Sequence, residues 1–436
     1  MRLRIAGVVL LLVLLVQGDF FAQNPEPAPK NGYVQASLFY PLGTSWKSSK
    51  FKTYHFSLNI FNGITGGVNG VEIGPISNIT LGKFNGMQLG GVNVVKGPFN
   101  GFQVGLLTNV NLSATQGFQL SGLWTHNHGD FTGFQFSWFG NTTWGNVYGA
   151  QLSHLWNHSQ KSMYGIQFAL GPNTARENAY GIQFSATMNY AGQNHAGVQF
   201  AFLANYAKSS QGFQLGAVNL APEKAGIQAG LFNYTGTSHT FQGGLINIAR
   251  KSGAVQVGLV NYSGDSSVAT IGLVNIVKRG YNKLELWGGE LQSFNIAVKT
   301  GGRRVYSMLN FGVNPFNENI FWTTGWGIGT HIPIGKRFYV DVDNTTSLVH
   351  INEPISLGKG KMTFLNQSRF MAGFSLHKRV ALFIGPMINV ILSDNNNLAN
   401  GKNGIELAPT FRTAYGKAGS FQFAIWPGIG GGIRFF

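Results

Sequence analysis

The chain has 436 residues, of which only 11% are charged and 13% are aromatic, and it contains 61 glycines and 35 phenylalanines. Ordinary soluble domains carry about 25% charged residues, so this chain has little to offer water over a large surface. It has no cysteine, which excludes disulfides, thiolate metal sites and a lipid anchor on a cysteine. Its formal net charge is +16, but the basic residues are scattered singly without a clustered stripe, so nucleic acid is not an expected partner.

Residues 1–23 have the features of a secretory signal peptide. Arg2 and Arg4 precede an apolar run from Ile5 to Val16, and Ala22 lies near a plausible cleavage position. This run is too short to span a bilayer as a helix, so we expect it to be cleaved, with a retained anchor as the alternative. Residues 24–31 are expected to form a proline-rich leader, and residues 32–69 to contribute N-terminal strands.

Residues 70–276 contain a tandem repeat centred on glutamine. The repeat spacing is 15 or 16 residues at first and 14 later, which leaves room for strands and turns but not for a helix-turn-helix unit. The same position is Glu72 in the first copy and Thr270 in the last. The glutamines, which we predict to line a lumen or a surface row, are Gln88, Gln103, Gln119, Gln135, Gln151, Gln167, Gln183, Gln199, Gln214, Gln228, Gln242 and Gln256.

Within a repeat, apolar and polar side chains alternate. From Tyr180 to Tyr190, one face carries Ile182, Phe184 and other apolar residues, and the opposite face carries Gln183 and other polar residues. Such alternation over about 9–11 residues is typical of a transmembrane strand. The sequence therefore predicts an all-β fold, an antiparallel outer-membrane β-barrel in which the 14–16-residue repeats are successive strands.

A parallel β-solenoid carried by a smaller C-terminal barrel is the alternative fold. In that arrangement the apolar face would point inward and Asn would form a ladder at a turn. Two features favour it: all repeats read in the same direction, and the alternation breaks in later repeats, as at Leu259-Val260-Asn261. A corner or a β-bulge would each produce such a break.

Residues 277–436 consist of longer strand-like runs separated by turn residues and end at Phe436, and they are expected to form C-terminal barrel strands. An alternating strand with a terminal Phe resembles the last strand of Gram-negative outer-membrane barrels, which the barrel-insertion machinery recognises. We therefore predict an outer-membrane location. The expected partners are that machinery, outer-membrane lipid and lipopolysaccharide.

The segments Gly101–Leu106, Gly212–Asn219 and Val255–Asn261 carry copies of a Gly-x-Gln-x-Gly-x-x-Asn unit, some of them incomplete. In this respect the chain resembles the bacterial family of surface repeat-containing proteins, and the resemblance covers about half of its length. The resemblance implies an outer-membrane or cell-surface location. It implies no catalytic residue, cofactor or ligand.

Few residues suggest chemistry. His126 with His128, and His154 with His158, lack an identifiable third metal ligand, so we expect no metal site. Asp341 and Asp343 share one face of a strand and are expected to be lumen-facing carboxylates balanced by Lys336 and Arg337. The turn from Asp394 to Asn403 has too few acidic residues for a calcium loop.

These observations predict a non-enzymatic outer-membrane protein without catalytic residues or cofactors. It would act as a pore with a Gln/Gly/Asn-lined lumen that passes small solutes. The alternative is a cell-surface module that binds glycan or protein or has a structural role, and an outer-membrane hydrolase built on a barrel is a distant one.

Overall fold

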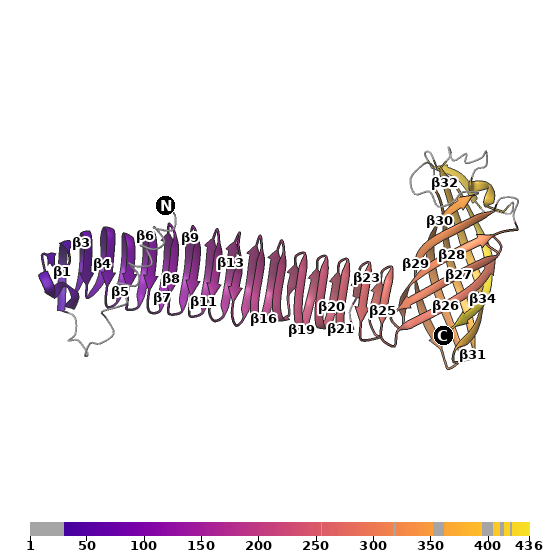
Figure 1. Ribbon diagram of the computed structural model, residues 1–436, viewed down its shortest axis with the longest axis horizontal. Helices are drawn as coiled ribbons and strands as arrows, with labels where there is room; N and C mark the ends of the chain where they lie inside the picture. Colours follow the sequence, from indigo (N-terminus) through magenta and orange to yellow (C-terminus); the bar gives the residue numbers. More distant parts are fainter. Residues whose placement is uncertain are drawn as a thin grey trace, which may run out of the picture. The chain divides into compact units, whose positions relative to one another are not determined.

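The structure is a computed structural model that describes residues 30–253, 255–316, 320–351, 362–394, 404–409, 414–418 and 421–436. The predicted signal peptide, most of the predicted leader and residues 395–403 of the asparagine-rich turn lie outside these ranges. The described chain is almost entirely β and contains a parallel β-solenoid of about 14 turns and a closed eight-stranded antiparallel barrel (Figure 1). It divides into two compact units, residues 1–180 and 181–436.

The first unit is a stack of solenoid turns. Its elements are β1 (Lys30–Phe39), β2 (Leu42–Gly43), the 3₁₀ helix η1 (Trp46–Phe51), β3 (Lys52–Thr65), β4 (Gly67–Thr80), β5 (Phe84–Val95), β6 (Phe99–Asn111), β7 (Thr115–Ser121), β8 (Trp124–Asn127), β9 (Phe131–Ser137), β10 (Gly140–Thr143), β11 (Val147–Ser153), β12 (Trp156–Ser159), β13 (Met163–Ala169) and β14 (Asn173–Ala175). Strand β15 (Ala179–Ser185) continues into the second unit. The predicted N-terminal strands of residues 32–69 belong to this stack, because β1 pairs in parallel with β3, and β3 with β4.

Each regular turn of the solenoid contains two strands. Strand β11 carries Gln151 and pairs in parallel with β9 and β13, so that Gln135, Gln151 and Gln167 are in register. Strand β12 forms the opposite side of the same turn and pairs in parallel with β10 and β14. Corresponding residues of successive repeats therefore stack on one another, and the glutamines stack on glutamines.

A glycine two residues before the glutamine allows this close stacking. Gly133 and Gly149 have φ values of 133° and 134°, a backbone conformation that residues other than glycine rarely adopt. A Cβ atom at Gly149 would lie 2.0 Å from the carbonyl oxygen of Gly133. Glycine therefore recurs at this position because any side chain would clash with the backbone of the preceding turn.

The prediction that successive repeats are antiparallel barrel strands is wrong, and the solenoid alternative is observed. A repeat of 14–16 residues holds two short strands and two turns rather than one long strand and one turn. Every repeat consequently runs in the same direction, which requires parallel pairing. The expected orientation within a solenoid is also wrong, since the glutamine and asparagine side chains point inward and most of the large apolar ones outward, with Phe84, Phe99 and Phe131 among the buried exceptions.

The second unit contains further solenoid turns followed by the barrel. The solenoid strands are β16 (Met188–Ala201), β17 (Ala204–Ser210), β18 (Phe213–Leu215), β19 (Val218–Ala229), β20 (Phe232–Gly243), β21 (Ile246–Ser252), β22 (Val255–Val257), β23 (Val260–Ser263), β24 (Ala269–Ile271) and β25 (Val274–Val277). The barrel region contains β26 (Tyr281–Gly289), β27 (Phe294–Gly301), β28 (Val305–Asn314), β29 (Phe321–Ile334), β30 (Phe338–Ile351), β31 (Thr363–His377), β32 (Val380–Asp394), the 3₁₀ helix η2 (Gly404–Leu407), β33 (Ala414–Ala418) and β34 (Phe421–Phe435).

The barrel closes through antiparallel pairing of its first and last strands. Strand β34 pairs with β32 on one side and with β26 on the other, where Leu284 lies opposite Phe435. Strand β33 adds a short pairing to β34. Side chains alternate between the two faces of the wall: on β32, Ile384 and Ile388 are exposed outside, while Met387 and Asn389 are buried inside.

Candidate functional site

All the glutamines predicted to line a lumen or a surface row are fully buried in the solenoid. In the first unit each carboxamide from Gln103 to Gln167 donates to the glutamine of the preceding turn at 2.7–2.8 Å. In the second unit the same bond joins Gln183 through Gln256 at 2.8–2.9 Å. We call these two series the glutamine ladders.

The lumen and surface-row predictions are therefore both wrong for these residues. The two sides of a turn pack directly on each other, so the space between them is filled with side chains and holds no channel. An amide stacked at the strand spacing of about 4.8 Å both donates to and accepts from identical neighbours. The ladder thus satisfies buried polar groups without water.

Asparagines form a second set of buried amides beside each ladder. In the first unit Asn93 Nδ2 donates to Asn109 Oδ1 at 2.9 Å and to the Val104 carbonyl at 2.7 Å. In the second unit Asn233 Nδ2 donates to Asn247 Oδ1 at 2.8 Å and to the Gly243 carbonyl at 2.9 Å. The solenoid core consequently contains rows of hydrogen-bonded amides beside buried apolar residues such as Phe99 and Phe131.

Glu72 occupies the glutamine position at the start of the first ladder and is fully buried. It accepts hydrogen bonds from Gln88 at 2.8 Å and from Thr80 at 2.9 Å. Burial nevertheless raises the pKa of the Glu72 carboxyl, because the surrounding core disfavours the charged form.

The outer faces of the solenoid are rich in apolar residues. Aromatic rings stack from turn to turn, for example Phe118 on Phe134 with centroids 4.8 Å apart in the first unit, and Phe184 on Phe200 at 4.8 Å in the second. Such contacts occur because one side chain per turn repeats at the strand spacing. The result is short aromatic rows on the surface, separated by aliphatic residues such as Ala150 and Leu152.

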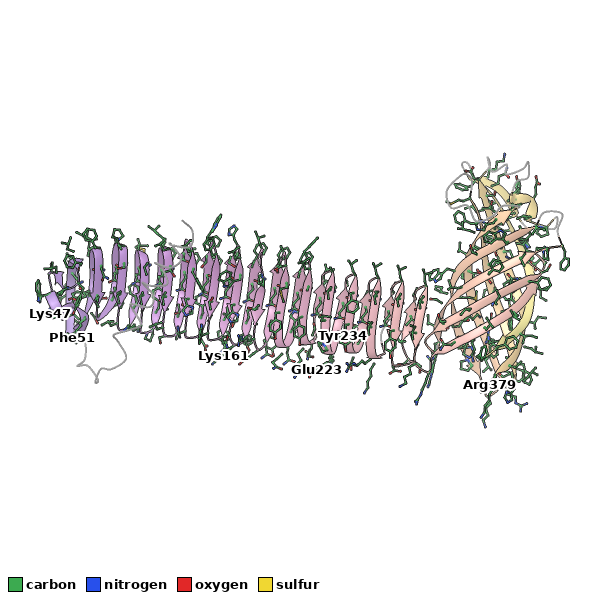
Figure 2. All side chains as sticks on the ribbon, viewed as in Figure 1. Lys47, Phe51, Lys161, Glu223, Tyr234 and Arg379 are labelled. Atoms are coloured by element: carbon green, nitrogen blue, oxygen red, sulfur yellow. The ribbon has the colours of Figure 1, made fainter. Side chains whose placement is uncertain are left out.

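Charged residues and exposed apolar residues occupy opposite edges of the turns. Every charged residue of the repeats other than Glu72 follows its glutamine position by eight to eleven residues, so in each unit these residues share one edge. We call it the charged edge; Figure 2 labels Lys161 on it in the first unit and Glu223 in the second. The other edge, three residues after the glutamine, is the apolar ridge, which exposes Leu106, Trp138 and Leu170 in the first unit and Phe202, Leu231, Leu245, Leu259 and Leu273 in the second.

The barrel interior contains an ion cluster. Asp341 and Asp343 face inward together as predicted, but the cations that pair with them are Lys299, Arg369 and Arg434 rather than Lys336 and Arg337. Glu285 is the third carboxylate, so three carboxylates pair with three cations. Its carboxylate oxygens lie 2.9 Å from Lys299 Nζ and 2.8 Å from an Arg369 nitrogen. The barrel ion cluster, Glu285, Lys299, Asp341, Asp343, Arg369 and Arg434, is almost completely buried.

The four cluster residues missed from the sequence carry a recognisable signal. Lys299, Arg369 and Arg434 are each the only Lys, Arg, Asp or Glu on the inward face of their strand, while Glu285 shares that face of β26 with Lys283. Because they come from β26, β27, β31 and β34, only closure of the barrel brings them together.

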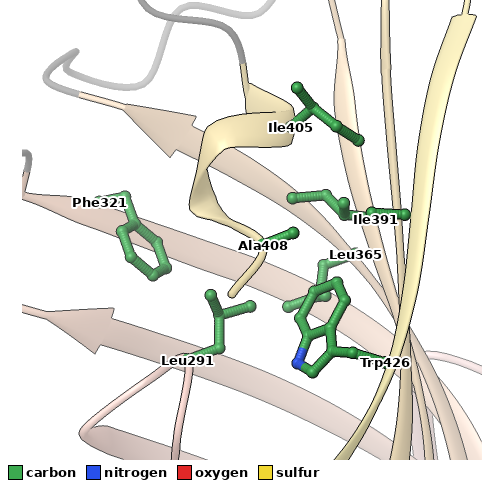
Figure 3. Packing of buried hydrophobic residues seen from close by; sticks show 8 residues of the cluster. Leu291, Phe321, Leu365, Ile391, Ile405, Ala408 and Trp426 are labelled. Carbon is green, nitrogen blue, oxygen red and sulfur yellow. The ribbon is translucent and has the colours of Figure 1, made fainter. Parts of the chain in front are cut away.

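The opposite end of the barrel interior is filled by an apolar cluster. Helix η2 places Ile405 inside, where this residue and Ala408 pack with Trp426 and Phe321, and the remaining members are Leu291, Leu365, Ile391 and Ala424 (Figure 3). Trp426 Nε1 also donates to Glu290 Oε1 at 3.1 Å. The interior is thus occupied at two levels.

The candidate histidines take part in aromatic packing. His126 and His128 have ring centroids 4.9 Å apart, and His128 stacks on Trp144. Burial, reinforced by His128, lowers the pKa of His126 to about 4. His154 instead packs against Trp138, and within the described residues no group of three His, Asp or Glu side chains could hold a metal ion.

Among the described residues, no helix is long and apolar enough to cross a membrane. No protein-family model, curated protein or solved structure matches the chain.

Proposed function

We propose that this chain is a non-enzymatic outer-membrane protein of the surface repeat-containing type, in which the C-terminal barrel is a closed membrane anchor for the solenoid. The carrying observation is the barrel itself: an apolar outer wall around an interior filled by the ion cluster and the apolar cluster. An eight-stranded barrel has an interior just wide enough for side chains to fill. A structural or binding role is therefore favoured over a pore.

The route to the membrane is part of the same proposal. A cleaved signal peptide at residues 1–23 would export the chain, and the last strand, ending at Phe436, would engage the barrel-insertion machinery. By the general rule for such barrels, short turns face the periplasm. Here these are the turns at residues 302–304, 335–337 and 378–379, and Figure 2 labels Arg379 in the last of them.

Two measurements on reconstituted protein test the anchor role. The full chain should change its mobility on heating in semi-native gels, as closed barrels do, and should give no stable conductance in planar bilayers. The variant Trp426→Ala should also remain silent, because the ion cluster still fills the interior. Steady ohmic channels from the unmodified protein would overturn the anchor proposal in favour of a pore.

A second candidate role, binding of a surface glycan or protein, is supported by the exposed aromatic residues of the first unit. Trp138, Trp144 and Trp124 are each 42–53% exposed, and flat aromatic faces suit apolar or sugar surfaces. Retention of the protein on a glycan array that is lost in Trp138→Ala would support this role. Equal retention of both proteins would refute it.

A further inference from the structure

We infer that the solenoid turns of the second unit lie within the bilayer, in the leaflet on the side of the barrel's short turns, with their apolar ridge toward the membrane centre. This inference rests on the proposed outer-membrane function. It concerns a different matter, namely that lipid covers the solenoid as well as the barrel.

The first reason is the composition of the solenoid surface in this unit. Outward side chains on one side are Ile182, Phe184, Val198, Phe200, Ile227, Phe241, Val255 and Val257, and those on the other side include Tyr206, Ile246, Tyr262, Val274 and Ile276. The ridge between the two sides is also apolar, with Phe202 75% and Leu231 58% exposed. Exposed apolar patches of this extent mark contact with a membrane or a partner.

The second reason is the segregation of charge. All charged residues of these turns lie on the charged edge, where Lys208, Lys224, Arg250 and Lys251 outnumber Glu223 and Asp265. An excess of basic residues beside an apolar surface suits anionic lipid headgroups. A protein partner with an apolar groove would not require charge to be confined to one edge over every turn.

Tyrosines mark the level between the two environments. Tyr206 precedes Lys208 by two residues and stacks on Tyr190 with centroids 5.1 Å apart. The Arg250 guanidinium carbon lies over the ring of Tyr234, 5.9 Å from the ring centroid. Tyrosine beside a charged boundary is typical of the membrane–water interface, where the ring contacts hydrocarbon and the hydroxyl contacts water.

The contacts of the last turns with the barrel wall set the depth. At the charged edge, the Ser266 carbonyl accepts from the Arg303 amide at 2.8 Å, in a short turn of the barrel. At the ridge, the Gly272 amide donates to Ser307 Oγ at 3.0 Å, and the Gly272 carbonyl accepts from Trp326 Nε1 at 3.2 Å. The charged edge is therefore level with the short turns, and the ridge is farther up the wall.

The depth of the ridge follows from strand geometry. Ser307 is four residues beyond Arg303, and Trp326 pairs with Leu309, six residues beyond it. At about 3.3 Å per residue and a strand tilt of about 40°, the ridge lies roughly 10–15 Å above the short turns. This is about half of the roughly 25 Å apolar band of such barrels, which corresponds to one leaflet.

The solenoid also meets the requirement that backbone groups be satisfied in lipid. Within this unit the solenoid strands pair in parallel with those of neighbouring turns, as β19 does with β18 and β20. At its last turn, the barrel supplies partners: besides the Gly272 bonds, Asn275 Nδ2 donates to the Thr300 carbonyl at 3.3 Å. Inside, the amides of the ladder hydrogen-bond to one another, as Gln242 does to Gln228.

Spin labelling tests the inference, since the chain contains no cysteine. Single variants Leu259→Cys on the ridge, Lys224→Cys on the charged edge and Ile388→Cys on the barrel wall are labelled in the full chain. Each is reconstituted into phosphatidylethanolamine–phosphatidylglycerol vesicles. Collision rates with oxygen, which concentrates in lipid, and with a water-soluble nickel chelate then report depth.

We expect the label at Leu259 to favour oxygen as the one at Ile388 does, and the label at Lys224 to favour nickel. The depths at Leu259 and Lys224 should differ by about 10 Å or more. Leu245→Cys is the second ridge position if Leu259→Cys does not fold.

Three other outcomes would overturn the inference. With Ile388 in lipid, a ridge label that favours nickel would place the solenoid in water. A ridge label shielded from both reagents would indicate a protein partner or a second copy. A label at Ile388 that favours nickel would refute the proposed anchor function, and the inference would fall with it.

Discussion

Replacing one glutamine in the middle of a ladder should destabilise the solenoid more than replacing the last one. Gln228 donates to Gln214 Oε1 at 2.9 Å and accepts from Gln242 Nε2 at 2.8 Å. Gln228→Met keeps a side chain of similar shape but leaves a buried acceptor on Gln214 and a buried donor on Gln242. At about 1–3 kcal/mol for each unsatisfied buried group, the expected loss of unfolding free energy is about 2–6 kcal/mol.

The matched control is Gln256→Met at the end of the same ladder. Gln256 donates to Gln242 Oε1 at 2.8 Å, while its own Oε1 has no hydrogen-bond partner. Each substitution also removes a bond to a tyrosine carbonyl, Tyr234 for Gln228 and Tyr262 for Gln256. The two variants therefore differ by one unsatisfied group on a neighbouring glutamine, and the loss at Gln256 should be smaller by about 1–3 kcal/mol. Urea unfolding of both variants in detergent, followed by circular dichroism, gives the two free energies. Equal losses would refute the idea that hydrogen bonding along the ladder stabilises the core.

Three further predictions concern buried charge. Burial raises the pKa of Glu72, so this residue favours folding most at low pH, and its contribution falls as pH rises from the ordinary glutamate value through the folded value. Glu72→Gln should remove that loss and raise the melting temperature at pH 8, and an unchanged pH profile would contradict the assignment. The pKa of His126 is lowered from 6.5 to about 4, so the contribution of this residue to stability falls as pH drops from about 6.5 toward 4. The variant His126→Gln should therefore show a smaller decrease of melting temperature between these pH values. An unchanged decrease would mean that other groups cause it. Lys299→Met leaves three buried carboxylates with two arginines, which should cost about 3–5 kcal/mol in barrel stability. The control Lys208→Met breaks only an exposed ion pair and should cost less than about 1 kcal/mol. Thermal unfolding of the two variants measures this difference, and equal losses would contradict the role of the buried cluster.

The sequence predicted which side chains share a face, but not how neighbouring strands pair. Alternation around Gln183 correctly separated inward amides from outward apolar residues. It is, however, compatible with parallel and with antiparallel neighbours, because both place alternate residues on opposite faces. The sequence feature that distinguishes the solenoid from the barrel is the break in alternation at Leu259-Val260-Asn261, which marks the corner between β22 and β23.

The barrel was predicted more closely than its interior. The longer strand-like runs expected in residues 277–436 correspond to barrel strands such as β31 and β32, because long alternating segments between clear turns leave little choice. The partners of Asp341 and Asp343 could not be found from proximity in sequence. Lys299, Arg369 and Arg434 reach these carboxylates only after the wall closes on itself.

The arrangement of polar and apolar groups in a single turn explains why the surrounding medium matters. In the turn that contains β22 and β23, Gln256 and Asn261 are buried, while Val255, Leu259 and Tyr262 are 38–50% exposed. In water, each buried amide bond gains about 1 kcal/mol net, since water offers equivalent bonds, whereas each large apolar side chain left outside forgoes about 1.5–3 kcal/mol of burial. Water would therefore favour apolar side chains inside the turn and amides outside. In hydrocarbon the apolar groups lose nothing by facing outward, and an amide facing outward would have no partner at all, so the orientation in this turn is the one expected from the lipid environment inferred above.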